Sequence, residues 1–331
     1  MTDATDTPGA TGATGSPAAP FGVHLLPIDI SAYARGNTGI DYVTTFESGR
    51  PGPHLMINAI THGNEVCGAH ALDFLFRNDI RPERGMLTLS FANVAAYQSF
   101  DRAYPYASRF VDEDFNRLWD AETLDGPRQS LELDRARELR RAVDAADHLL
   151  DIHSVELPQP PMLLAGIHAK GRRLAEGLGS PQHVVMDPGH AAGKRLRDYA
   201  RFDDPDAENQ SMLVECGYHF YEEAALIATQ TALRFLRHYD AVDADVLAHH
   251  LDPDPVEPQR FIEVSGPVTI KTDSFRFARA FHGFEVVPEA GTLIGHDGEE
   301  EVRTPYDDCV MIMPARDPLK GKTAVRLGRL V

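Results

Sequence analysis

The sequence predicts an α/β protein that carries a small β domain at its carboxyl end. Short apolar runs of strand length alternate with helix-like stretches over the first three quarters of the chain. Strands that are apolar along their whole length are typical of a sheet covered on both faces. With 331 residues, 43% of them hydrophobic, the chain has enough apolar material for two domains, which excludes a disordered or collagen-like protein.

The expected strands are short apolar segments, and the expected helices carry apolar residues at three- and four-residue spacing. We expect strands at 54–61, 86–94, 148–154, 162–168, 183–187 and 211–216. We expect helices at 65–78, 130–146 and 218–239.

Changes in composition along the chain predict its division into domains. Residues 1–20 are small, polar and rich in Pro and Gly, which favours a disordered tail. An α/β domain is expected over 21–250. Three prolines within 251–260 indicate a linker, and the short β-rich runs that follow predict a small β domain over 261–331.

The charge and the cysteine content bear on the binding partners and the cellular compartment of the protein. The net charge is −18 and no basic cluster stands out, so nucleic acid and anionic membranes are poor partners. Three cysteines without a CxxC pair favour a reducing compartment. There is no apolar run of membrane-spanning length and no signal-peptide pattern at the start. We therefore expect a soluble, cytoplasmic protein.

His62 and Glu65 lie where the first apolar strand ends and a helix is expected to begin. Such a corner lies at the carboxyl edge of the sheet, the usual ligand position in open α/β folds. The two side chains are candidate ligands of one metal ion, with Gly63 allowing the tight turn. An HxxE pair is a weak signal by itself, because such pairs often belong to the surface of a helix.

His153 stands at the end of another expected strand, in the segment HLLDIHS. Together with His62 and Glu65 it would complete the three protein ligands of a catalytic zinc site, which keeps a position for water. Asp151 either points to the opposite face or holds the imidazole. The alternative is that His153 is an ordinary core histidine with its hydrogen bonds satisfied.

The loop with Arg109, Asn116 and Arg117 is a candidate receptor for a carboxylate. Two guanidinium groups and an amide can donate forked hydrogen bonds to such a group. The alternative is an ordinary salt-bridged loop, since acidic residues at 112–114 supply partners.

Glu215 ends the expected strand at 211–216 and precedes a glycine. Burial would raise the pKa of this carboxyl group, which suits it to taking a proton from water. A structural ion pair with an arginine is the alternative.

Taken together, the segments HGNE, DFNR with its preceding Arg109, DIHS and VECG occur in an order that resembles one enzyme family. The chain is similar, over about residues 50–330, to the succinylglutamate desuccinylase/aspartoacylase family, a branch of the zinc-carboxypeptidase-like hydrolases. The resemblance implies a mixed, mostly parallel sheet flanked by helices. It also implies that the carboxyl-terminal β domain narrows access to the metal.

The resemblance implies a role for each matching residue. His62, Glu65 and His153 would bind one Zn²⁺ per chain. Glu215 would act as general base and later as proton donor, and Arg109 would polarise the scissile carbonyl.

The same resemblance implies that Asn116 and Arg117 hold the free carboxylate of the substrate. Tyr306 is a candidate substrate contact from the β domain. Some family members use a further arginine, for which this chain offers three candidates: Arg195, Arg197 and Arg201.

The function implied is a zinc-dependent deacylase that hydrolyses the amide bond of an N-acyl amino acid or a similar small anionic amide. Three alternatives stay open: a zinc carboxypeptidase acting on short peptides, an esterase using the same site, and a non-catalytic protein that binds zinc and a ligand. A homo-oligomer is compatible with the sequence.

Overall fold

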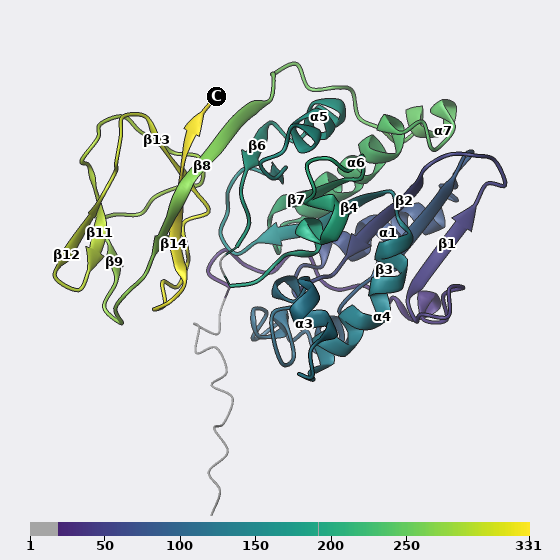
Figure 1. The fold of residues 1–331 in the computed structure, drawn as a ribbon, viewed down its shortest axis with the longest axis horizontal. Helices are drawn as coiled ribbons and strands as arrows, with labels where there is room; N and C mark the ends of the chain where they lie inside the picture. Colours follow the sequence, from purple (N-terminus) through teal and green to yellow (C-terminus); the bar gives the residue numbers. More distant parts are fainter. Residues whose placement is uncertain (1–18, 191) are drawn as a thin grey trace, which may run out of the picture.

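The computed structural model describes residues 19–190 and 192–331. The tail predicted over 1–20 lies outside these residues except for its last two positions. Over the described chain, helices surround one large sheet, and the carboxyl-terminal strands form a β-rich part at one side of it (Figure 1). A small antiparallel sheet belongs to this part. The predicted fold class is confirmed.

The large sheet has eleven strands in the order β1-β3-β2-β4-β7-β5-β6-β8-β14-β13-β10. Its strands are β1 (Val43–Glu47), β2 (His54–Ala59), β3 (Met86–Phe91), β4 (His148–Val155), β5 (Met162–Leu164), β6 (His183–Met186), β7 (Gln210–Tyr218), β8 (Arg260–Thr269), β10 (Val286–Val287), β13 (Cys309–Ile312) and β14 (Thr323–Leu330). The small sheet contains β9 (Arg276–Phe277), β11 (Leu293–Asp297) and β12 (Glu300–Arg303).

The large sheet is mixed, with parallel strands at its centre. Strands β3, β2, β4 and β7 are parallel neighbours, and so are β5, β6 and β8. Strand β1 and the strands beyond β8 pair antiparallel, and β5 runs antiparallel to β7. The carboxyl ends of β2, β4 and β7 therefore lie side by side at one edge of the sheet.

Three helices agree with the stretches predicted at 65–78, 130–146 and 218–239 to within a few residues. They are α1 (Cys67–Arg77), α2 (Val94–Gln98), α3 (Ala121–Asp125), α4 (Leu131–Ala145), α5 (Ala169–Leu178), α6 (Glu222–His238) and α7 (Ala244–Ala248). The start of α6 is later than predicted because β7 continues to Tyr218, which pairs with Val155 of β4. Strand β1 and helices α2, α3, α5 and α7 were not predicted. No helix in the described part of the chain combines the length and the apolar character that crossing a membrane requires.

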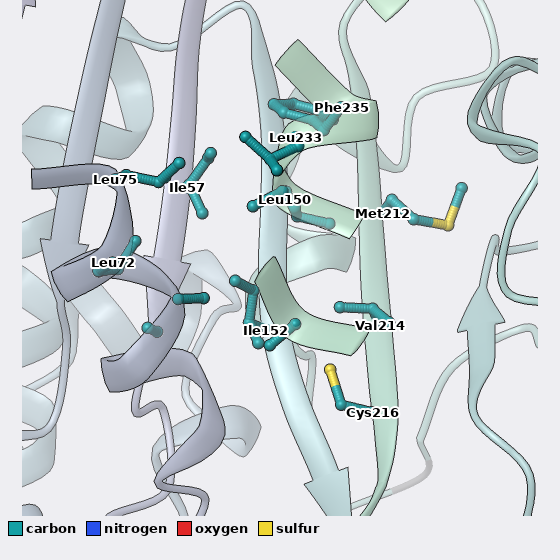
Figure 2. Close-up of a cluster of buried hydrophobic side chains, with 14 of the residues drawn as sticks. Ile57, Leu72, Leu75, Leu150, Ile152, Met212, Val214, Cys216, Leu233 and Phe235 are labelled. Carbon is teal, nitrogen blue, oxygen red and sulfur yellow. The ribbon is translucent and has the colours of Figure 1, made fainter. Parts of the chain in front are cut away.

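Side chains of the central strands alternate between two buried layers. Ile57 and Leu150 pack with α1, α5 and α6 in one layer (Figure 2). Their neighbours Met56 and Leu149 point to the other face and pack with α4 and the segment 115–119. Successive side chains of a strand point to opposite faces, so strands that are apolar throughout need helices on both sides.

The carboxyl-terminal strands continue the large sheet. Strand β8 pairs in parallel with β6 along Val184↔Phe261 and its neighbours, and β14 and β13 follow it. Hydrogen bonds therefore run across the predicted boundary at 251–260. The division into an α/β domain and a β domain stays a prediction.

A cavity between β4 and the helices should lower the stability of the protein. Leu150→Ala removes a fully buried side chain, and we expect it to lower the free energy of unfolding by about 2–5 kcal/mol. Leu226→Ala, on the exposed side of α6, should change it by less than about 0.5 kcal/mol. Urea denaturation of both variants measures this, and equal losses would contradict the assignment of Leu150 to the core.

Candidate metal centre

The turn after β2 lies directly against a neighbouring loop. A Cβ on Gly63 would come within 2.3 Å of the Ala96 carbonyl carbon and 2.4 Å of the Ser108 carbonyl oxygen. Only glycine therefore fits without displacing backbone. The Gly63 N–H donates to the Arg109 carbonyl oxygen at 3.1 Å, which joins the turn to the segment carrying Arg109.

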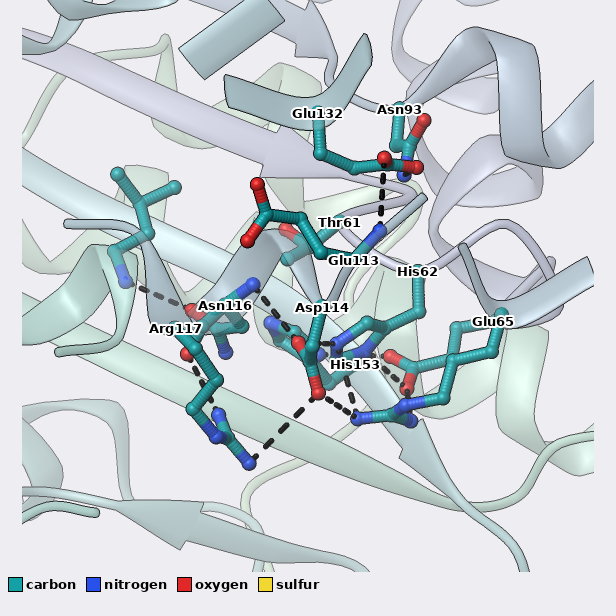
Figure 3. A network of polar contacts seen from close by, with 12 residues as sticks. Thr61, His62, Glu65, Asn93, Glu113, Asp114, Asn116, Arg117, Glu132 and His153 are labelled. Carbon is teal, nitrogen blue, oxygen red and sulfur yellow. Dashed lines mark hydrogen bonds and ion pairs between the residues drawn. The ribbon is translucent and has the colours of Figure 1, made fainter. Parts of the chain in front are cut away.

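His62, Glu65 and His153 form a buried group whose candidate ligand atoms all lie within 4.8 Å of one another. Strand β4 lies beside β2, with Ile152 opposite Ala59, so His153 emerges next to the turn that carries the other two. His62 Nδ1 lies 2.7 Å from Glu65 Oε1, and His153 Nδ1 lies 2.8 Å from Glu65 Oε2 (Figure 3). One carboxylate thus faces both imidazoles.

A second carboxylate lies on the far nitrogen of each imidazole. Asp151 Oδ2 is 2.8 Å from His153 Nε2, and Asp114 Oδ1 is 2.9 Å from His62 Nε2. Asp151 is fully buried, and its other oxygen accepts hydrogen bonds from Thr61 Oγ1 and Asn58 Nδ2. Carboxylates in this position fix the orientation and the tautomer of metal-binding histidines.

The residues present fit a divalent cation. Both nitrogens of His153 face carboxylate oxygens, which only accept, so a proton or a cation must lie between its Nδ1 and Glu65. Burial opposes ionisation, yet Asp151 and Glu65 hold the pKa of His153 well above its ordinary value. Burial likewise raises the pKa of Glu65, but the two imidazoles more than offset this and hold it well below its ordinary range. Two imidazoles and one carboxylate are a ligand set that zinc uses in catalytic sites.

Glu215 lies beside this group on the adjacent strand, where β4 and β7 pair His153 with Glu215. It is 7% exposed, and its Oε2 has no hydrogen-bond partner among the described residues. Burial and, second, the charge of Glu65 raise the pKa of Glu215 well above its ordinary value. A raised pKa suits a buried carboxyl group to taking up and releasing a proton.

Arg109 contacts Asp114 and also two members of the buried group, His62 and Glu65. Arg109 Nη2 lies 3.1 Å from Asp114 Oδ2 and 3.0 Å from His62 Nε2, and its Nη1 lies 3.4 Å from Glu65 Oε1. The Arg109 side chain is 27% exposed. Arg109 therefore lies between solvent and the buried triad of His62, Glu65 and His153.

Asn116 and Arg117 both contact Asp114, whose Oδ1 accepts a hydrogen bond from the Asn116 N–H at 2.9 Å. Arg117 Nη2 is 3.9 Å from Asp114 Oδ2, and its Nη1 donates to the Asn116 carbonyl oxygen at 2.6 Å. The amide oxygen of Asn116 accepts a hydrogen bond from the Leu196 N–H at 2.8 Å, and Asn116 is 3% exposed. Tyr306 does not contact these residues in the described part of the chain. Its hydroxyl group contacts Ser265 and its ring contacts the Arg329 guanidinium, both on carboxyl-terminal strands. Its role as a substrate contact stays a prediction.

Asp114 is the site residue whose role sequence reasoning missed. The sequence offered it only as an ion-pair partner, yet it touches His62, Arg109 and Arg117 at once. Its place two residues before Asn116, in the segment DFNR, was the available signal. Burial raises its pKa, but Arg109 and His62 hold the pKa of Asp114 well below its ordinary range.

The three candidate further arginines divide into two groups. Arg195 and Arg197 are buried and share Asp198. Arg201 donates to the Asp144 and Ala146 carbonyl oxygens. Arg326 of β14, which no sequence pattern indicated, shares Asp187 with Arg195.

Comparison with known proteins agrees with this geometry. The profile of the succinylglutamate desuccinylase/aspartoacylase catalytic domain matches residues 51–239, more than half of the chain. The chain belongs to this family. The predicted resemblance is confirmed, and the family consists of hydrolases. No curated protein matches the chain in sequence.

Several solved structures share the fold at low sequence identity. A succinylglutamate desuccinylase from Vibrio parahaemolyticus is 17% identical with a TM-score of 0.65, covering 88% of this chain and 86% of its own. A succinylglutamate desuccinylase/aspartoacylase from Rhodobacter sphaeroides is 18% identical with a TM-score of 0.64, covering 92% and 93%. The ectoine utilization protein EutE (DoeB) from Ruegeria pomeroyi, solved with bound product, is 15% identical with a TM-score of 0.60, covering 92% of each chain.

The contact between Asp151 and His153 predicts a loss of metal affinity on substitution. Asp151→Asn keeps the shape but removes the charge that holds Nε2–H, so we expect the zinc dissociation constant to rise by about ten- to one-hundredfold. Competition with a chromophoric chelator measures it, with Asp134→Asn on the exposed side of α4 as control. An unchanged constant in Asp151→Asn would contradict the orienting role.

Proposed function

We propose that this family member is a zinc-dependent deacylase. It hydrolyses the amide bond of an N-acyl amino acid or a similar small amide that carries a carboxylate, and it works in the cytoplasm. The observation that carries the proposal is the buried triad of His62, Glu65 and His153 beside Glu215, whose Oε2 has no hydrogen-bond partner in the described part of the chain. The three buried free cysteines are compatible with a reducing compartment.

Zinc held by the triad would supply a Lewis acid that polarises the carbonyl and lowers the pKa of water near the site. The protein groups do the rest. Glu215 takes the proton of the attacking water and passes it to the departing amine, a cycle that its raised pKa suits. Arg109 directs guanidinium N–H groups toward the triad, where they stabilise the negative charge that grows on the carbonyl oxygen.

An excess of arginine charge supports an anionic substrate. Five arginines share three aspartates here: Arg109, Arg117, Arg195, Arg197 and Arg326 with Asp114, Asp187 and Asp198. Arg109 has one further carboxylate within reach, Glu65, but that group is a candidate metal ligand.

Arg117 is one guanidinium whose pKa is lowered by burial and by the neighbouring arginine charges. Burial, and then the neighbouring charges of Arg109, Arg195 and Arg326, lower the pKa of Arg117 in spite of Asp114. A substrate carboxylate at Arg117 would relieve this repulsion. This group of arginines is thus suited to anions although the whole chain carries a net charge of −18, because charges beyond about a Debye length are screened.

The first test combines metal content with a substrate panel. We expect about one zinc per chain in the wild type, little in His62→Ala and His153→Ala, and amine release from N-acyl amino acids only where zinc is bound. The panel includes matched carboxamides, which lack the charge that Arg117 would recognise, together with esters and short peptides. A wild type without zinc, and without activity on added zinc, would overturn the proposal in favour of a binding role.

Glu215→Gln tests the proton-transfer step separately from metal binding. Because the amide cannot take a proton, kcat should fall by about 10²–10⁴-fold while zinc content stays at the wild-type value. Glu208→Gln, an exposed position shortly before β7, should keep full activity. Wild-type kcat in Glu215→Gln would remove this residue from the mechanism.

A further inference from the structure

Glu132 is a buried carboxylate that forms no ion pair with any of residues 19–190 and 192–331. It lies in the first turn of α4 and is fully inaccessible to solvent. The ion pairs around it join its neighbours Glu113, Asp134 and Glu138 to arginines, and none of those described includes Glu132. A carboxylate kept in such a place needs other compensation.

Four N–H donors supply that compensation. Oε1 accepts from the backbone of Val111 at 2.6 Å and from Asn93 Nδ2 at 3.1 Å. Oε2 accepts from the backbone of Asp112 at 3.0 Å and of Glu113 at 3.2 Å. Three consecutive backbone amides therefore converge on one side chain, an arrangement that fixes the loop to the start of the helix.

The helix start and the loop are also joined in the reverse direction. Asp112 Oδ2 accepts from the Leu131 N–H at 2.8 Å, and Glu113 Oε1 accepts from Ser130 Oγ at 2.5 Å. Residues 111–113 thus have little freedom to move relative to α4.

Both ends of this network lead to the candidate metal centre (Figure 3). Asp114 follows Glu113 directly and contacts His62, Arg109 and Arg117. On the other side, the Asn93 N–H donates to the Ile60 carbonyl oxygen at 3.0 Å, two residues before His62. The position of the Asp114 carboxylate therefore depends on a loop that Glu132 holds.

We infer that Glu132 is a positioning residue: by holding the amides of residues 111–113 it places Asp114 against His62 Nε2 and Arg117, and so sets both metal affinity and substrate affinity. Glu132 itself touches neither metal nor substrate. The inference concerning substrate rests on the proposed function, whereas that concerning metal needs only the triad.

Glu132→Gln is the informative variant because its shape is unchanged. Its amide NH₂ would face backbone N–H donors, so at least one pair of hydrogen bonds is lost and the loop is released. We expect the zinc dissociation constant, from chelator competition, and KM for an active N-acyl amino acid each to rise by about tenfold. Glu138→Gln, an equal charge change on the exposed side of the same helix, should leave both within twofold.

Glu132→Asp provides a second variant that keeps the charge. Its shorter side chain cannot reach both donor pairs, so it should give a smaller rise in the zinc dissociation constant. It also carries the test if Glu132→Gln does not fold by circular dichroism. A role in stability alone would lower the melting temperature without changing the zinc dissociation constant or KM of the folded protein.

Folded variants with wild-type zinc affinity and KM would overturn the inference. A wild type that binds zinc but hydrolyses no amide, with weaker zinc binding in Glu132→Gln, would overturn the proposed deacylase and support the role of Glu132 at the metal centre.

Discussion

The rest of the site depends on one interaction: the buried Glu65 carboxylate contacts the imidazoles of both His62 and His153. A negative charge without solvent is tolerated only where positive charge compensates it, and both Nδ1 atoms face it at 2.7 and 2.8 Å. The imidazoles are in turn held by Asp151 and Asp114. The outer carboxylates thus orient the imidazoles, and the imidazoles compensate the charge of Glu65.

The sheet sets where these groups meet. Parallel pairing of β2, β4 and β7 brings three strand ends to one edge, so residues far apart in sequence need no long side chains to converge. The buried layers on either face fix the register, because a shift by one residue would exchange the sides to which Ile57 and Met56 point. Accurate placement of the ligands is therefore a property of the core.

The sequence allowed prediction of the α/β class, the main helices and the strand ends that carry His62 and His153, because apolar periodicity records which faces are buried. It could not supply the neighbours of each strand, which depend on pairing across the whole chain. Asp114 and Glu132 were not assigned their roles, since those follow from the conformation of one loop. Arg326 carries no pattern at all, because its importance comes from β14 lying close to Asp187.

The pairing of β6 with β8 has a consequence for how the protein can be divided. If the strands from β8 onward were removed, β6 would present an open row of backbone donors and acceptors at the end of a hydrophobic sheet. Such an edge is a template for another chain, so a shortened protein would tend to aggregate through this strand. The carboxyl-terminal strands thus protect the large sheet from association, whatever they contribute to substrate access.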